Sequence, residues 1–304
     1  MNAVLFNRHS ELRSGWKVLL FIVITFSIIT ALTFPFQYFD YRNDFVGPML
    51  GLAGALAGSY AMTRFVNRKP LSAIGLSFHY QAIREFYWGC ILGFLMISGI
   101  FAVMYLGENI TLVSKELSFG GTLGIVSSSL LFFAIGAVVE EVLFRGYPFQ
   151  SLIQGITILP AMIIMAVLFA LLHLSNPNTS VFGIINVGLA AIWLSFAYLK
   201  TRGLWLPFGL HLGWNYSQTT IYSFPTSGIE FEERTLAVST ITGPEWFTGG
   251  AFGPEGGVLA TCALVLCTWY ILKSKRFSIP EGIVTLDSVE DLLRKEGRLE
   301  GQSG

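Results

Sequence analysis

The stretch GAVVEEVLFRGYPFQ, Gly136–Gln150, determines how the rest of this chain is interpreted. Its first half is apolar enough to lie inside a membrane, yet it carries Glu140, Glu141 and Arg145. A charged side chain inside a bilayer is costly, so such groups usually face a bundle interior, pair with one another or take part in chemistry. These three residues are therefore candidates either for pairing with one another or for chemistry inside a helix bundle.

The composition favours a membrane environment. Of 304 residues, 53% are hydrophobic and 12% are charged, whereas about 25% are charged in a typical soluble domain. The 19 basic and 19 acidic residues balance, which gives no indication of a nucleic-acid partner. The three cysteines lack the spacing of a disulfide framework or a zinc site.

Eight apolar segments approach the length of a spanning helix, which needs about 20 residues. An open sheet edge cannot satisfy its hydrogen bonds in lipid, so all of these segments are expected to be helices. The sequence thus predicts an all-α, polytopic transmembrane bundle of about eight spanning helices. The segments are residues 16–37, 46–66, 86–106, 121–145, 158–175, 181–199, 205–224 and 256–272.

Basic residues predict the orientation of the bundle. With eight spans, every cluster of Lys and Arg falls on one side, which by the positive-inside rule is the cytoplasmic side of an integral membrane protein. Both termini are then cytoplasmic, and a bacterial cell membrane is the expected location. Residues 1–276 form the bundle, and the tail 277–304 includes a short amphipathic helix. The Gly-rich outer loop 243–257 has no assigned role.

Helical spacing separates the roles of the two adjacent carboxylates. Arg145 follows Glu141 by four residues, so the two share a helix face and can pair. Glu140 lies about 100° around the helix and is left free to point elsewhere. Gly136 and Ala137, one turn earlier, are expected to let another helix approach closely.

Three more polar residues are expected at the level of Glu140. If the chain turns between Gly155 and Pro160, near position 156.5, then His173 returns to the height of Glu140. His211 and Asn215 are four residues apart and share one face of a later helix. A free carboxylate, two imidazoles and an amide can supply a general base and oxyanion donors.

Three motifs in this order resemble the CPBP intramembrane endopeptidases. EEVLFR at Glu140–Arg145 matches E-E-x-x-x-R, FALLH at Phe169–His173 matches F-x-x-x-H, and HLGWN at His211–Asn215 matches H-x-x-x-N. That family includes the type II CAAX prenyl endopeptidases and Abi-like bacterial proteins tied to bacteriocin processing and self-immunity. The resemblance covers roughly residues 120–225.

The resemblance implies peptide hydrolysis without a covalent intermediate, in a site recessed from the cytoplasmic face. Glu140 would activate the attacking water, and His173 would position that water or bind a metal. His211 and Asn215 would stabilise the oxyanion or complete the site, and Glu141 and Arg145 would support Glu140. The expected partners are a peptide or protein substrate, with prenylated CAAX-like or bacteriocin-type peptides as options, and membrane lipid.

Several alternatives stay open at this point. Two His and a Glu could hold a catalytic zinc, and a metal-free site can equally be written. A membrane immunity or scaffold protein would use the same cavity without turnover. A transporter would relay protons through Glu140 and the histidines, but it predicts an internal repeat, and none is found. A serine protease is disfavoured because nothing ties Ser127, Ser128 or Ser129 to a histidine.

Overall fold

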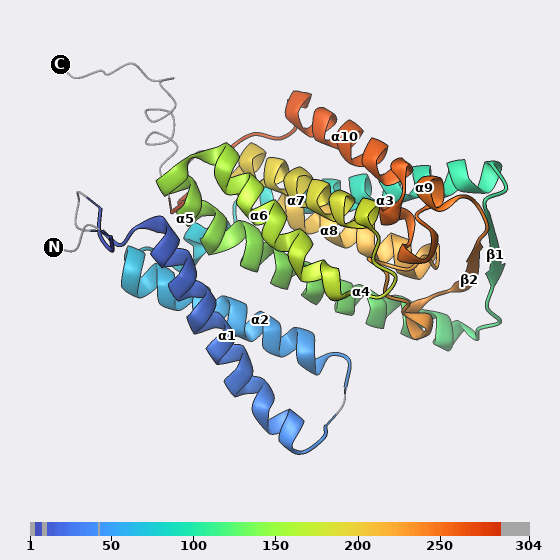
Figure 1. Cartoon of the computed structure of the whole chain (residues 1–304), viewed down its shortest axis with the longest axis horizontal. Helices are drawn as coiled ribbons and strands as arrows, with labels where there is room; N and C mark the ends of the chain where they lie inside the picture. The colour runs from blue at the N-terminus through green and yellow to red at the C-terminus, as the bar shows by residue number, and fades with distance from the viewer. Residues whose placement is uncertain (1–3, 8–10, 42, 287–304) are drawn as a thin grey trace.

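The computed structural model describes residues 4–7, 11–41 and 43–286. Helices occur at all eight predicted places and lie side by side in one elongated bundle (Figure 1). The helices are α1 Ser14–Tyr38, α2 Val46–Ala61, α3 Ala82–Leu106, α4 Phe119–Glu141, α5 Tyr147–Ile156, α6 Ile158–Leu172, α7 Val181–Thr201, α8 Trp205–Tyr216, α9 Glu245–Thr248 and α10 Val258–Lys273.

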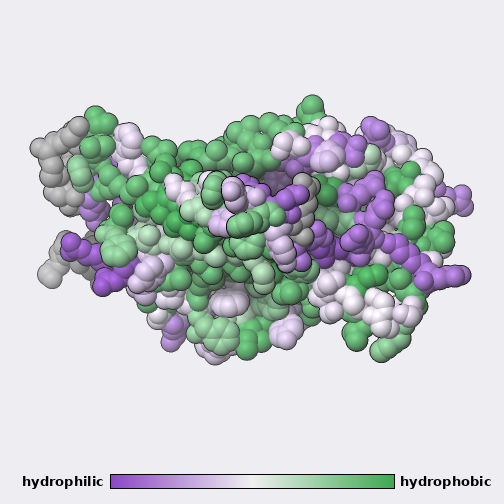
Figure 2. Space-filling model, turned by 90° about the horizontal axis from the view of Figure 1, so that it is seen from below, coloured by the Kyte–Doolittle hydropathy of each residue, from purple (hydrophilic) through white to green (hydrophobic). Residues whose placement is uncertain are grey.

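Five helical segments are long and apolar enough to cross a membrane, as judged by length and composition. They are α1, α3, the continuous segment Phe119–Ile156, the segment Ile158–Ser175 and α7. The shorter α2, α8 and α10 pack in the same bundle. Hydrophobic residues cover the middle of the face in Figure 2, and hydrophilic ones gather toward its right-hand end. The predicted all-α membrane bundle is confirmed.

A short pair of strands, which the sequence did not predict, marks one end of the bundle. Strand β1 (Ile110–Ser114) pairs antiparallel with β2 (Ala237–Ile241), with Leu112 opposite Ser239. We call this end the strand end and the opposite one the α5 end (Figure 1). The α5 end holds the basic residues that follow α2, α7 and α10. The predicted amphipathic helix in the tail lies outside the described residues except for Leu286.

Three π-helical turns interrupt or extend the helices in the described part of the chain. Val142–Gly146 joins α4 to α5, Ser217–Ile221 follows α8, and Met62–Asn67 follows α2. A π-turn inserts an extra residue into a helix and is frequent at functional sites. The chain then reverses at Thr157, whose φ of 73° ends α5 and starts α6. The predicted turn between Gly155 and Pro160 is therefore present.

Helices α3 and α8 approach each other so closely that their backbones touch. A Cβ atom added to Gly89 would lie 2.6 Å from the Leu206 carbonyl oxygen, and one added to Gly93 would lie 2.6 Å from the Trp214 nitrogen. Small residues at four-residue spacing allow this kind of contact between membrane helices. The contact fixes the position of α8, which carries His211 and Asn215.

Candidate active site

Glu141 is the buried centre of the polar cluster. Its side chain is 1% exposed, and its Oε1 accepts from Arg145 Nη1 at 3.1 Å. The predicted pair between these residues is thus present. The same Oε1 also accepts from His211 Nδ1 at 2.9 Å, a contact that helical spacing could not predict because His211 lies on α8. Glu141 therefore joins α4 to α8 in addition to balancing Arg145.

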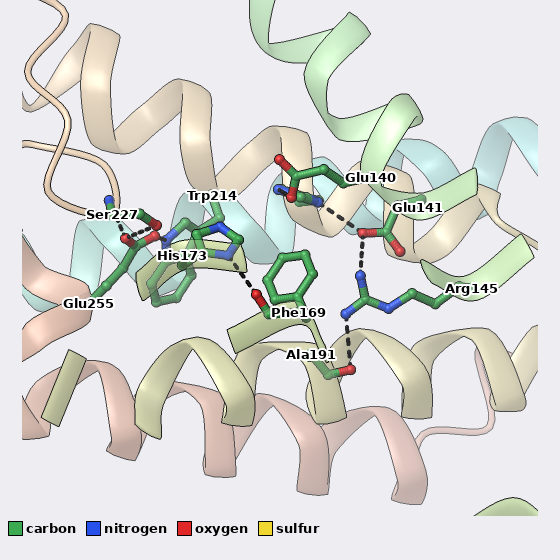
Figure 3. Close-up of polar contacts among 10 residues, drawn as sticks. Glu140, Glu141, Arg145, Phe169, His173, Ala191, Trp214, Ser227 and Glu255 are labelled. Carbon is green, nitrogen blue, oxygen red and sulfur yellow. Dashed lines mark hydrogen bonds and ion pairs between the residues drawn. The ribbon is translucent and has the colours of Figure 1, made fainter. Parts of the chain in front are cut away.

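Arg145 connects this centre to two further helices. Its Nη2 donates to the Ala191 carbonyl oxygen on α7 at 3.0 Å. Its guanidinium group also lies 5.0 Å from the centre of the Phe169 ring on α6. The side chain is 1% exposed, so its charge is balanced almost wholly by these contacts. Figure 3 shows the chain of contacts from Glu141 through Arg145 to Ala191.

Glu140 faces away from this buried pair, as the spacing predicted. Its side chain is 37% exposed, and its Oε2 lies 3.7 Å from His211 Nε2. Since a carboxylate only accepts, His211 donates from Nδ1 to Glu141, and in the neutral ring Nε2 carries the lone pair. The imidazole of His211 is therefore held between two carboxylates, and its second nitrogen faces Glu140.

His173 follows the last turn of α6 and is oriented by its own helix. Its Nδ1 contacts the Phe169 carbonyl oxygen at 2.8 Å. Because a carbonyl oxygen only accepts, Nδ1 carries the proton, and Nε2 of the neutral ring is left with a lone pair. The ring also packs on Phe169, with centroids 4.6 Å apart. His173 is thus fixed in orientation without a direct contact to Glu140.

One cavity of about 360 Å³ brings the four predicted site residues together. Its walls include Glu140, His173, His211 and Asn215, so the expected convergence of three helices is present. The lining is otherwise largely apolar and aromatic, which is typical of ligand sites. The cavity also reaches the strand-end loops that contain Asn176 and Ser227, on the side away from the basic clusters.

The expected role of Gly136 in helix contact is wrong. An atom added at its Cβ position would meet nothing within 4 Å, and the residue lines the cavity instead. The close contact of α4 with α2 lies elsewhere, where Gly51 faces Val139 at 3.7 Å. The lack of a side chain at Gly136 leaves room in the cavity one turn from Glu140.

Sequence reasoning missed a second carboxylate at the cavity. Glu255, in the Gly-rich loop 243–257, lines it and accepts from Trp214 Nε1 at 3.0 Å. Its other oxygen accepts from the Ser227 backbone nitrogen at 2.5 Å and from the Ser227 hydroxyl at 2.8 Å. No motif signals this role, because the three residues come from separate loops and from α8.

The donor set does not form a metal site in the described part of the chain. Among these residues, no three His, Cys, Asp or Glu side chains lie close enough together to hold a metal ion. Glu140 and His211 are near neighbours, but no group of described residues that also includes His173 could hold a metal ion there. The geometry therefore does not fit the zinc set of two histidines and a glutamate considered from the sequence.

A comparison with protein families bears on the whole cluster. Residues 122–217 match a family model described as type II CAAX prenyl endopeptidase Rce1-like. Comparisons with curated proteins and with solved structures gave no match. The matched segment contains all three motifs, from Glu140 to Asn215, and the match implies an endopeptidase of the CAAX type acting within the membrane. Over residues 122–217, this integral membrane protein is therefore similar to the Rce1-like type II CAAX prenyl endopeptidases.

Proposed function

We propose that this protein hydrolyses a peptide bond inside the membrane by means of a water molecule activated by Glu140. The observation that carries the proposal is the unequal environment of the two adjacent carboxylates. Glu141 is buried and bound to Arg145 and His211, whereas Glu140 is 37% exposed at the cavity and 3.7 Å from His211. Of these two adjacent carboxylates, Glu140 is therefore the one available to a water molecule and a bound peptide.

The proton transfers of such a reaction can be assigned to side chains of the cavity. Glu140 takes a proton as the water oxygen attacks the peptide carbonyl carbon, and the carbon–nitrogen bond then breaks. The same proton passes to the departing nitrogen, so that one water is consumed and a carboxyl and an amine are formed. His211 Nε2 lies 3.7 Å from Glu140 Oε2 and, with its lone pair, can accept a hydrogen bond from Glu140 once Glu140 holds the proton.

Two other groups fit the remaining tasks. The side-chain amide of Asn215 lines the cavity and can donate to the oxyanion that develops on the attacked carbonyl. His173 Nε2, with a lone pair when the ring is neutral, can accept a hydrogen bond from the attacking water. Glu141 and Arg145 are positioning residues, since they act through His211. No step of this scheme requires a metal.

The cavity also bears on the substrate class. A volume of about 360 Å³ lies at the lower end of ligand pockets, and it admits a few residues of an extended chain. Aromatic and aliphatic walls favour an apolar peptide, or one carrying a prenyl group, that reaches the site from the bilayer. We therefore infer that prenylated CAAX-like peptides are the first substrates to test, with unmodified bacteriocin-type peptides as the second class.

The test is cleavage of farnesylated and unmodified C-terminal peptides by detergent-solubilised protein, followed by mass spectrometry. Glu140→Gln should lower the rate by about 10²–10⁴-fold, the usual contribution of a general base. The matched control is Glu233→Gln, at an exposed glutamate of the strand end, which should retain the full rate. Equal activity in both variants would contradict the assignment, and peptide binding without cleavage would favour an immunity or scaffold protein.

A further inference from the structure

The Gly-rich loop Gly243–Gly257 contributes Glu255 to the lining of the cavity at its strand end. It contains α9 and two short 3₁₀ turns, Gly250–Phe252 and Pro254–Gly256. Phe252, 1% exposed, anchors it against the start of α7, where a Cβ atom on Gly183 would lie 2.8 Å from the ring. The Gly228 nitrogen donates to the Phe252 carbonyl oxygen at 2.8 Å. The loop is therefore seated on two other segments.

Asn186 binds the backbone at the end of this loop. Its Nδ2 donates to the carbonyl oxygens of Glu255 and Gly257, at 2.8 and 2.9 Å. Its Oδ1 accepts from Thr261 Oγ1 at 2.7 Å. Asn186 is 2% exposed and lines the cavity, so these bonds are shielded from solvent and hold the backbone of Glu255 in one place.

From this fixed backbone, the Glu255 carboxylate reaches into the cavity wall. It is bound by three neutral donors, the Trp214 indole and the nitrogen and hydroxyl of Ser227. Within the described residues, no Lys or Arg forms an ion pair with it. In Figure 3, His173 lies between the Glu255–Ser227 contact and the pair Glu140–Glu141. Glu255 thus marks the wall across the cavity from Glu140.

Trp214 connects Glu255 to the helix that carries the proposed site residues His211 and Asn215. It lies on α8 between His211 and Asn215, is 5% exposed, and packs on Trp193 with ring centroids 5.9 Å apart. An indole can rotate about two side-chain bonds, so its edge needs a partner to stay in place. The Glu255 carboxylate is the hydrogen-bond acceptor that Trp214 has.

We propose that Glu255 is a positioning residue that fixes the strand-end wall of the cavity through Trp214 and Ser227, and so limits how far a substrate chain extends beyond Glu140. The part that concerns substrate length rests on the proposed function. A wall held by three hydrogen bonds favours short segments beyond the scissile bond. Loss of those bonds lets Trp214 rotate and lengthens the space available.

The first test reads Trp214 without any substrate. The tryptophan emission of the protein minus that of its Trp214→Phe variant gives the emission of Trp214. The same subtraction in the Glu255→Ala background, with and without Trp214→Phe, should give a difference spectrum at longer wavelength, since the indole loses its partner and gains water. Glu255→Gln keeps an acceptor oxygen and should give a smaller shift, and Glu245→Ala, at an exposed glutamate of the same loop, should give none. An unchanged spectrum in Glu255→Ala overturns the proposal, whether or not the protein is a protease.

The second test measures the binding affinity of peptides of different length. It uses the Glu140→Gln variant as the parent, because binding can be measured without cleavage. The probes are a fluorescein-labelled, S-farnesylated CAAX-type peptide and the same peptide lengthened after its cysteine by two and four residues. Glu255→Ala should raise the affinity ratio of long to short peptide on the order of tenfold, about what one lost hydrogen bond allows. Glu255→Gln should lie between Glu255→Ala and the parent.

Each outcome of the second test is decisive. An unchanged ratio in Glu255→Ala overturns the length limit. Equal loss of affinity for every length in the Ala and Gln variants would mean that Glu255 binds substrate by its charge, which also overturns it. If no peptide binds even the parent, the proposed substrate class fails, and the fluorescence result alone decides the positioning role. If Glu255→Ala does not fold, Glu255→Gln carries both tests.

Discussion

Replacement of Gly89 by alanine should separate helices α3 and α8 at the level of His211. The added Cβ atom would lie 2.6 Å from the Leu206 carbonyl oxygen and 2.7 Å from the Leu210 nitrogen. Ordinary contact begins near 3.4 Å, so one helix must move by roughly 0.8 Å, the difference between these distances. Both obstructing atoms belong to backbone, and no flexible side chain can yield in their place.

The displacement has a cost in stability and in geometry. Overpacking of this kind costs about 1–3 kcal/mol. A shift of α8 by this amount would lengthen the 2.9 Å bond between His211 Nδ1 and Glu141 Oε1 beyond hydrogen-bonding distance. A misplacement of about 1 Å in a catalytic group can lower a rate on the order of 10²-fold. Cleavage should therefore fall more than the loss of stability alone would suggest.

The matched control is Gly99→Ala in the same helix. A Cβ atom there would meet nothing within 4 Å, and alanine has the higher helix propensity, so stability should hold or rise slightly. The assay combines thermal unfolding in detergent with the initial rate of peptide cleavage. If Gly89→Ala unfolds at the parent temperature and cleaves at the parent rate, the argument that backbone contact positions α8 is refuted.

Two further substitutions test the buried charges and the pH response. Arg145→Ala leaves Glu141 buried beside His211 only, which should lower the free energy of unfolding by about 3–5 kcal/mol, whereas Arg64→Ala, at an exposed site, should change it by less than about 0.5 kcal/mol. Chemical denaturation in mixed micelles measures both, and equal effects would contradict the structural role of Arg145. Burial lowers the pKa of His79, in the connection before α3, below its ordinary value. The folded protein then binds fewer protons than the unfolded chain, so stability should be fully present above about pH 6.5 and fall as the pH drops below it. Thermal unfolding from pH 8 to pH 5 should show this decline, and His79→Gln should reduce it; an identical decline in the variant would rule His79 out as its source.

Much of the fold could be predicted because lipid imposes simple rules on sequence. The apolar segments, the reversal at Thr157 and the pair of Glu141 with Arg145 all follow from length, helix breakers or four-residue spacing. Each of these is local in the chain, so its physical cause can be read from neighbouring residues.

The contacts that could not be predicted join segments far apart in the chain. Glu141 bonds to His211, 70 residues away, and Ser227 bonds to Glu255 from another loop. The pairing of β1 with β2 likewise joins two loops. Gly136 was misread because a small residue is equally suited to helix contact and to lining a cavity, and only the position of α2 decides between them.

The π-turn Val142–Gly146 has a consequence for how this site could vary. In an uninterrupted α-helix, each residue advances the face by about 100°, so the orientation of the carboxylates would dictate that of every later side chain. The extra residue of the π-turn changes the rotation of the side chains of α5 about the helix axis relative to those of α4. The carboxylate face and the packed face of α5 can therefore be altered separately, whereas deletion of one residue from the turn would rotate one face against the other.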